Sequence, residues 1–204
     1  MRLFLFDVDS TLINEEVIEL IAAHAGVEKE VAQITERAMA GELDFAASLR
    51  ERVSLLNGIS NDALLEVGKK ITLTNGAVEL IEAIHSAGDL PAVVSGGFLE
   101  VITPIMQQLG IKDYLANTLE VADGHLTGRV SSKIVDREAK AAFLSELSGK
   151  YSPAQTIAVG DGANDIEMIK AADIGIAFCA KPALQAVADV VITNRDLREV
   201  LANL

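Results

Sequence analysis

The 204-residue sequence has a single cysteine, Cys179. It also lacks any hydrophobic run of the roughly 18 residues that a membrane-spanning helix needs. One cysteine cannot form a disulfide within the chain, which excludes a disulfide framework and fits a reducing compartment. The apolar run at 1–6 is shorter than the core of a secretory signal. We therefore expect a soluble cytoplasmic protein with no membrane partner, in which Cys179 is a small buried residue.

Positive charge is scarce, because 17 Lys and Arg stand against 30 Asp and Glu, for a formal net charge of −13. Such a chain repels the phosphates of nucleic acids, so no nucleic-acid partner is expected. The same repulsion acts on a small phosphorylated substrate. A phosphate site in this chain therefore has to gather positive charge locally, through a metal ion and a few placed Lys or Arg.

Short apolar runs alternate with helix-like segments along most of the chain, a pattern typical of a parallel α/β sheet. At this length the chain forms one large domain, or a domain carrying a smaller insert. The predicted strands are 3–6, 90–94, 156–159, 174–178 and 190–193, and the predicted helices include 75–87, 98–109 and 163–171.

Two segments depart from this alternation. Residues 117–130 consist of two alternating halves that meet at Asp123-Gly124, a favoured type I′ turn, which predicts a β-hairpin. Between 14 and 71 the apolar residues fall at helical spacing instead. We therefore predict an α/β fold with a Rossmann-like open parallel-sheet core, 1–13 and 72–204, that carries a small hairpin and is interrupted by an inserted helical cap, 14–71.

Acidic residues follow two of the predicted strands. Asp7 and Asp9 come after the first strand, where residues two apart in extended chain point the same way. Gly160-Asp161-Gly162-Ala163-Asn164-Asp165 follows the strand 156–159. Ligands of open parallel sheets bind beyond these strand ends, facing carboxylates repel unless a cation joins them, and hard oxygen ligands suit Mg²⁺. The alternatives are an Asp that caps the next helix and an ordinary acidic turn.

A third candidate site follows the strand 90–94, in Ser95-Gly96-Gly97-Phe98. A hydroxyl and exposed backbone N–H groups at the start of a helix form a cradle for phosphate. A serine that only caps the helix is the alternative interpretation.

Taken together, Asp7-Val8-Asp9-Ser10-Thr11, Ser95-Gly96-Gly97-Phe98 and Gly160-Asp161-Gly162-Ala163-Asn164-Asp165 resemble the ordered motifs of haloacid dehalogenase superfamily phosphatases. The segments 177–182 and 195–199 resemble those of its phosphoserine phosphatase branch, so the resemblance spans essentially the whole chain. It implies an Mg²⁺-dependent phosphomonoesterase, a monomer or homodimer, that hydrolyses O-phospho-L-serine in the last step of serine biosynthesis.

The resemblance also implies a role for each motif residue. Asp7 would be the nucleophile that forms an aspartyl-phosphate, and Asp9 would act as acid and base. Among the lysines between the second and third motifs, the pattern at 134–140 favours Lys140 over Lys133 and Lys150. The implied phosphate-binding residues are Ser95, Gly96 and Lys140. The implied metal-binding residues are Asp7, Asp9, Asp161 and Asp165.

Selectivity for phosphoserine needs an acid for its ammonium and an arginine for its carboxylate. Glu16 and Arg52 match the family's positions for these roles, Met39 and Phe45 would line the pocket, and Asn164 would lie close by. Without the resemblance, Arg52 is interpreted as part of a solvated helix face and Glu16 as a first-turn residue that suits the helix dipole.

Two other functions stay open at this point. The same machinery could act on another small phosphorylated metabolite, such as homoserine phosphate, or pass the phosphoryl group to an acceptor alcohol. A non-catalytic binding module is the other alternative, which the loss of a motif carboxylate would favour. All four motif carboxylates are present in this chain.

Overall fold

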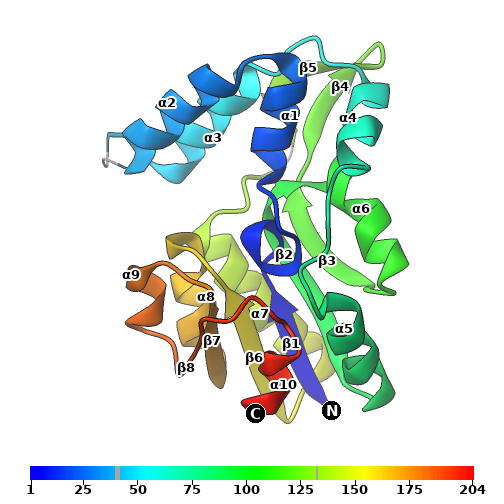
Figure 1. Ribbon diagram of the computed structural model, residues 1–204, viewed down its shortest axis with the longest axis vertical. Coiled ribbons are helices and arrows are strands. Elements are labelled where there is room, and N and C mark those ends of the chain that lie inside the picture. The colour runs from blue at the N-terminus through cyan, green and yellow to red at the C-terminus, as the bar shows by residue number, and fades with distance from the viewer. Residues whose placement is uncertain (40–41, 132) are drawn as a thin grey trace.

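The computed structural model describes residues 1–39, 42–131 and 133–204, and the side chain of Met39 lies outside the described part. A six-stranded parallel sheet forms the centre of the molecule, with the strand order β3-β2-β1-β6-β7-β8 (Figure 1). Its strands are β1 (Arg2–Phe6), β2 (Leu90–Phe98), β3 (Asp113–Asn117), β6 (Gln155–Gly160), β7 (Ile174–Phe178) and β8 (Val190–Ile192). This is the α/β sheet that the sequence predicts.

Helices cover both faces of the sheet because successive side chains of a buried strand point to opposite sides. In β1, Phe4 and Phe6 belong to one buried cluster, and Leu3 and Leu5 belong to the other. The first cluster includes side chains of α5 (Ala77–Ser86), α6 (Leu99–Gln108) and α10 (Glu199–Ala202), and the second includes side chains of α7 (Arg137–Tyr151), α8 (Ile166–Ala171) and α9 (Pro182–Gln185).

Among the described residues between β1 and α5 the chain forms four helices, which are α1 (Val17–Ala25), α2 (Glu28–Met39), α3 (Phe45–Ser54) and α4 (Asn61–Gly68). They lie above the sheet in Figure 1, together with the hairpin of β4 (Leu119–Ala122) and β5 (His125–Val130). The hairpin is hydrogen-bonded to the connection between α3 and α4, where the Gly58 N–H donates to the Leu126 carbonyl at 2.8 Å. The hairpin therefore contacts the helical insert and stabilises its position.

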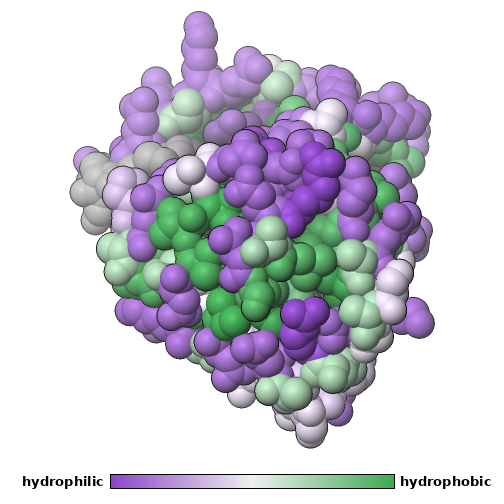
Figure 2. All heavy atoms as spheres, turned by 60° about the horizontal axis from the view of Figure 1, so that its bottom comes forward, coloured by the Kyte–Doolittle hydropathy of each residue, from purple (hydrophilic) through white to green (hydrophobic). Residues whose placement is uncertain are grey.

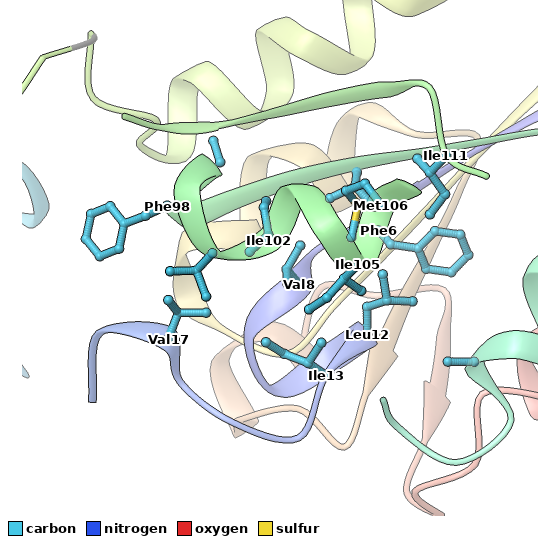
Figure 3. Close-up of a cluster of buried hydrophobic side chains, with 14 of the residues drawn as sticks. Phe6, Val8, Leu12, Ile13, Val17, Phe98, Ile102, Ile105, Met106 and Ile111 are labelled. Atoms are coloured by element: carbon cyan, nitrogen blue, oxygen red, sulfur yellow. The ribbon is translucent and has the colours of Figure 1, made fainter. Parts of the chain in front are cut away.

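A short irregular turn, residues Val8–Leu12, follows β1 and carries Asp9, with non-helical backbone angles at Asp9 and Ser10. Figure 3 shows Val8, Leu12 and Ile13 lying beside Ile102 and Ile105 of α6 in a fully apolar cluster. The turn is closed by a hydrogen bond from the Ile13 N–H to the Val8 carbonyl, at 3.0 Å. This packing holds the backbone of the turn firmly against the sheet.

The hairpin is confirmed, because Asp123 and Gly124 have φ angles of +51° and +76°, as a type I′ turn requires. One predicted strand end is wrong, and one strand was missed. The strand predicted to end at residue 94 continues to Phe98, with a register shift beyond Val94, so Ser95 lies in a strand rather than at a helix start. The strand β3 was not predicted, because only three apolar residues lie between its polar ends, Asp113 and Asn117.

Cys179 is half-buried rather than buried, because it lies in the loop that follows β7. Its Sγ contacts the carbonyl oxygen of Thr193 at 3.6 Å. Among the residues described, no helix combines the length and the apolar character needed to cross a bilayer.

Figure 2 shows an apolar area ringed by hydrophilic side chains, with the end of the molecule that carries both termini turned forward. The exposed large apolar side chains of the described residues are Met1, Leu65, Val78, Val121, Val191 and Leu204. Apolar patches of a few hundred Å² occur on monomers and at subunit contacts alike. The expected monomer or homodimer therefore stays a prediction.

Candidate active site

The candidate site lies at the carboxyl end of β1, which pairs with β2 on one side and β6 on the other. The strand order reverses here, and open α/β sheets bind ligands at such a point. A cavity of about 610 Å³ opens between these strand ends and the helical insert. Its lining includes eight of the predicted site residues, which are Asp7, Asp9, Glu16, Phe45, Arg52, Gly96, Asp161 and Asn164.

The other predicted residues lie beneath the floor of this cavity or outside the described part. Ser95, Lys140 and Asp165 are fully buried. The side chain of Met39 is outside the described residues. Eleven predicted residues that are spread over more than 150 positions of the chain therefore gather around one cavity.

Lys140 joins two of the carboxylates. Its Nζ donates to Asp7 Oδ1 at 2.5 Å and to Asp165 Oδ1 at 2.7 Å, and none of the lysine side chain is exposed. Burial lowers the pKa of Lys140, but the Asp165 and Asp7 carboxylates raise it by more, so its pKa lies above the ordinary value. The lysine is held in place by the start of α7, where Asp136 caps the helix through the Ala139 N–H.

Asp165 is held by the turn that follows β6. Its Oδ2 accepts the N–H groups of Asp161 at 3.2 Å and Gly162 at 3.0 Å. A Cβ on Gly160 would lie 2.6 Å from the Asp165 carboxyl carbon, so only glycine allows this side chain to fold back over the strand end. The predicted turn is therefore built around Asp165, which precedes α8 in a short 3₁₀ turn, Ala163–Asp165.

Three carboxylates converge closely enough to share a cation. Asp7, Asp161 and Asp165 each offer an oxygen atom within 4.8 Å of the others. Burial and the Asp165 carboxylate raise the pKa of Asp7 well above its usual range, and the same two causes raise the pKa of Asp161 to about 6. Burial is the larger cause of both shifts, and the repulsion between neighbouring carboxylates adds to it. The all-oxygen donor set fits a hard divalent cation.

Asp9 has two contacts with different parts of the fold. Its Oδ1 accepts the N–H of Val17 at 3.0 Å, so Asp9 does cap the start of α1, and its Oδ2 accepts the Ser95 hydroxyl at 3.4 Å. Burial raises the pKa of Asp9 to about 7, and the Glu16 carboxylate adds to the effect. A carboxyl group with such a pKa can both donate and accept a proton near neutral pH.

Ser95 does not cap the helix that follows it. Its Oγ accepts the N–H of Gly97 at 2.7 Å, within β2. The N-cap position of α6 is Phe98, whose side chain makes no cap. The simple capping interpretation of Ser95 is therefore wrong, because the strand continues past it.

The insert contributes the far wall of the cavity. Arg52 is half-buried and donates through Nε to the Ser48 carbonyl at 3.3 Å, whereas Arg50 on the same helix is exposed. Burial lowers the pKa of the Arg52 guanidinium, and Glu16 opposes that shift most strongly. The Glu16 side chain accepts the Ser10 hydroxyl at 2.8 Å. Arg52 therefore faces the site rather than the solvent.

Sequence reasoning missed four polar residues of the cavity wall, which are Thr35, Ser48, Arg137 and Lys181. Ser48 precedes Arg52 by four residues, so helical spacing could have found it. Arg137 and Lys181 lie inside segments that resemble the family, but nothing in their spacing separates them from surface cations. Both add positive charge to a chain that is strongly acidic overall.

Comparison with known proteins agrees with this geometry. The family model of haloacid dehalogenase-like hydrolases matches residues 4–170. The chain belongs to the haloacid dehalogenase-like hydrolases. This membership confirms the resemblance inferred from the three motifs.

Within this hydrolase family, the chain is similar to phosphoserine phosphatases over nearly its full length. It is 48% identical over 201 residues to one from Streptococcus thermophilus, with 98% of this chain and 94% of that protein covered. It is 48% identical over 202 residues to one from Methanocaldococcus jannaschii, with 98% and 96% covered. A solved phospho-aspartyl intermediate analogue of phosphoserine phosphatase matches with a TM-score of 0.92, 47% identity and coverage of 99% and 98%.

We expect Lys140→Met to destabilise the metal-free protein by about 3–5 kcal/mol, because it leaves buried carboxylates without their ammonium. The free energy of unfolding in urea measures this loss. Lys150→Met on the same helix is the matched control. Lys150 pairs with Asp113 at the surface, where solvent screens the pair, so its loss should change the free energy of unfolding far less. Equal effects of the two substitutions would contradict the charge-balance interpretation.

Proposed function

We propose that this hydrolase removes the phosphate from O-phospho-L-serine, through an aspartyl-phosphate on Asp7. The observation that carries the proposal is the similarity, over nearly the full length of both chains, to phosphoserine phosphatases. The cavity supports it, because Asp7 and Asp9 line its floor while Glu16 and Arg52 line its wall. The product serine places the reaction at the end of serine biosynthesis.

In the first step an Asp7 carboxylate oxygen attacks the phosphorus atom. The bond from phosphorus to the ester oxygen breaks, and the departing oxygen takes a proton from Asp9. The two carboxyl groups have different environments, because Asp7 is bound by Lys140 whereas Asp9 is bound by Val17 and Ser95. These environments suit Asp7 for attack on phosphorus and Asp9 for proton transfer.

In the second step water attacks the phosphorus of the aspartyl-phosphate and releases inorganic phosphate. Asp9, now ionised, accepts the proton of that water. Lys140 donates hydrogen bonds to the phosphoryl oxygens, and Ser95 with the Gly96 N–H completes the cradle. These groups supply the local positive field that the net charge of the chain opposes.

Mg²⁺ is the cation that we assign to the carboxylate cluster. Asp7, Asp161 and Asp165 would hold it, together with the main-chain carbonyl of Asp9. When bound, the ion supplies positive charge that offsets these carboxylates and the phosphoryl oxygens. This positive charge would lower the repulsion between the Asp7 carboxylate and the phosphate.

We infer that residues 14–71 form the cap that selects the substrate. Glu16 faces the ammonium of phosphoserine, Arg52 faces its carboxylate, and Phe45 and Asn164 line the space between the cap and the sheet. Arg52 is suited to this role, because a guanidinium binds a carboxylate through two parallel hydrogen bonds. The remainder of the chain, 1–13 and 72–204, forms the catalytic core.

Asp7→Asn tests the nucleophile. We expect turnover to fall at least about a thousandfold, because an amide is a poor nucleophile and the residues of a catalytic unit act together. Steady-state phosphate release measures the effect. Asp123→Asn is a matched control, because it makes the same change in an exposed hairpin turn that accepts Asn. Activity of Asp7→Asn within tenfold of the parent would sink the assignment.

Metal removal tests the cation. A chelator should abolish activity, Mg²⁺ should restore it, and Ca²⁺ should inhibit, because its larger shell can engage both oxygens of Asp7. Mg²⁺ at about a hundred times its Kd should also stabilise the fold by about 2.7 kcal/mol, read as a rise in Tm. Asp161→Asn should reduce that rise. Full activity in metal-stripped buffer would refute this assignment.

Arg52→Ala tests the substrate. Removing one partner of a buried charged pair costs about 2–5 kcal/mol, which lowers kcat/KM for phosphoserine by roughly 30- to 4,000-fold. An aryl phosphate has no carboxylate to lose, so its kcat/KM should change little. Arg50→Ala is the control, because Arg50 is an exposed arginine of the same helix.

The two substrates separate three interpretations of Arg52. A solvated surface arginine would leave both substrates unaffected, and a phosphate-binding arginine would affect both alike. A loss confined to phosphoserine supports the proposal. An equal effect on both substrates would end it.

A further inference from the structure

Ser48 has a hydroxyl group that the protein itself leaves unused. Its side chain is 1% exposed, and its Oγ has no hydrogen-bond partner. Among the described residues three other buried side-chain atoms lack a partner, Oγ1 of Thr11, Oγ1 of Thr74 and Oε2 of Glu100, but these residues do not line the cavity that contains Asp7. Ser48 does line it.

The missing bond is unusual for a serine in a helix. A helical hydroxyl ordinarily donates to a carbonyl of the preceding turn. Thr35, Ser54 and Ser148 do so, at 3.0, 2.7 and 2.8 Å. Burying a hydroxyl without a partner is costly, so an unpaired one beside a cavity is available for a hydrogen bond to a group bound there.

Ser48 is placed beside the arginine of the same wall. The two residues are four positions apart on α3, so they share one face of the helix. The Ser48 carbonyl accepts the Arg52 Nε–H at 3.3 Å, which holds the guanidinium close to the serine. Both side chains line the cavity.

We propose that the Ser48 hydroxyl donates a hydrogen bond to the carboxylate that Arg52 binds, and so helps to select α-carboxylate phosphate esters. This inference rests on the proposed function and adds a specificity-determining residue to it. The guanidinium draws an anion to this wall, and a hydroxyl beside it completes the anion's coordination. A hydrogen bond to a charged acceptor is roughly twice as strong as a neutral one, which favours the carboxylate as its partner.

The experiment compares O-phospho-L-serine with O-phosphoethanolamine, which keeps the ammonium and the phosphate but lacks the carboxylate. We expect Ser48→Ala to lower kcat/KM for phosphoserine by about 10- to 100-fold and for phosphoethanolamine by less than about twofold. In an Arg52→Ala background the further loss should fall below about threefold, because both residues serve one carboxylate. Ser54→Ala, an exposed serine of the same helix, should change neither substrate.

The melting temperature separates this role from a structural one. Ser48→Ala removes no hydrogen bond from the free protein, so its Tm should be unchanged or raised. A lowered Tm, an equal loss on both substrates or no loss on either would overturn the inference. If the parent hydrolyses phosphoserine and only Arg52→Ala lowers kcat/KM for phosphoserine selectively, the role proposed for Ser48 is wrong and the proposed function stands. If the parent does not hydrolyse phosphoserine, the proposed function falls with it.

Discussion

The balance of charge around the Lys140 ammonium constrains the rest of this structure. A fully buried lysine links Asp7, which follows β1, to Asp165, which precedes α8. Carboxylates this close repel one another in a low-dielectric interior, and burial together with that repulsion raises the pKa values of Asp7 and Asp161. The ammonium offsets part of this repulsion. A divalent cation bound by the carboxylate oxygens would offset the rest.

The backbone around this charge cluster leaves little freedom. The apolar side chains of the turn after β1 pack beneath α6. This packing keeps the turn in place despite the repulsion between the carboxylates. Gly160 admits Asp165 where any side chain would collide with it, and Asp136 fixes the start of α7. Hydrophobic packing thus holds polar groups in positions that electrostatics alone would disfavour, which is common at catalytic sites.

Much of the fold could be predicted from the sequence, because buried parallel strands carry near-continuous apolar runs and helices carry a periodic apolar face. The hairpin was also predictable, because Asp123-Gly124 favours a type I′ turn. The strand β3 was missed, because only three apolar residues lie between the polar ends of Asp113–Asn117. The extension of β2 through Gly96 was missed because glycines are typical of turns.

By itself the sequence determined the element types, the acidic turns after β1 and β6, and the motifs that mark the family. These are local properties, set by periodicity, turn preference and the spacing of a few residues. Tertiary structure alone decided that Arg52 faces the cavity while Arg50 faces solvent, and that the Ser48 hydroxyl is buried without a partner. Both depend on how the insert packs above the sheet, and contacts between residues distant in sequence leave no trace in local pattern.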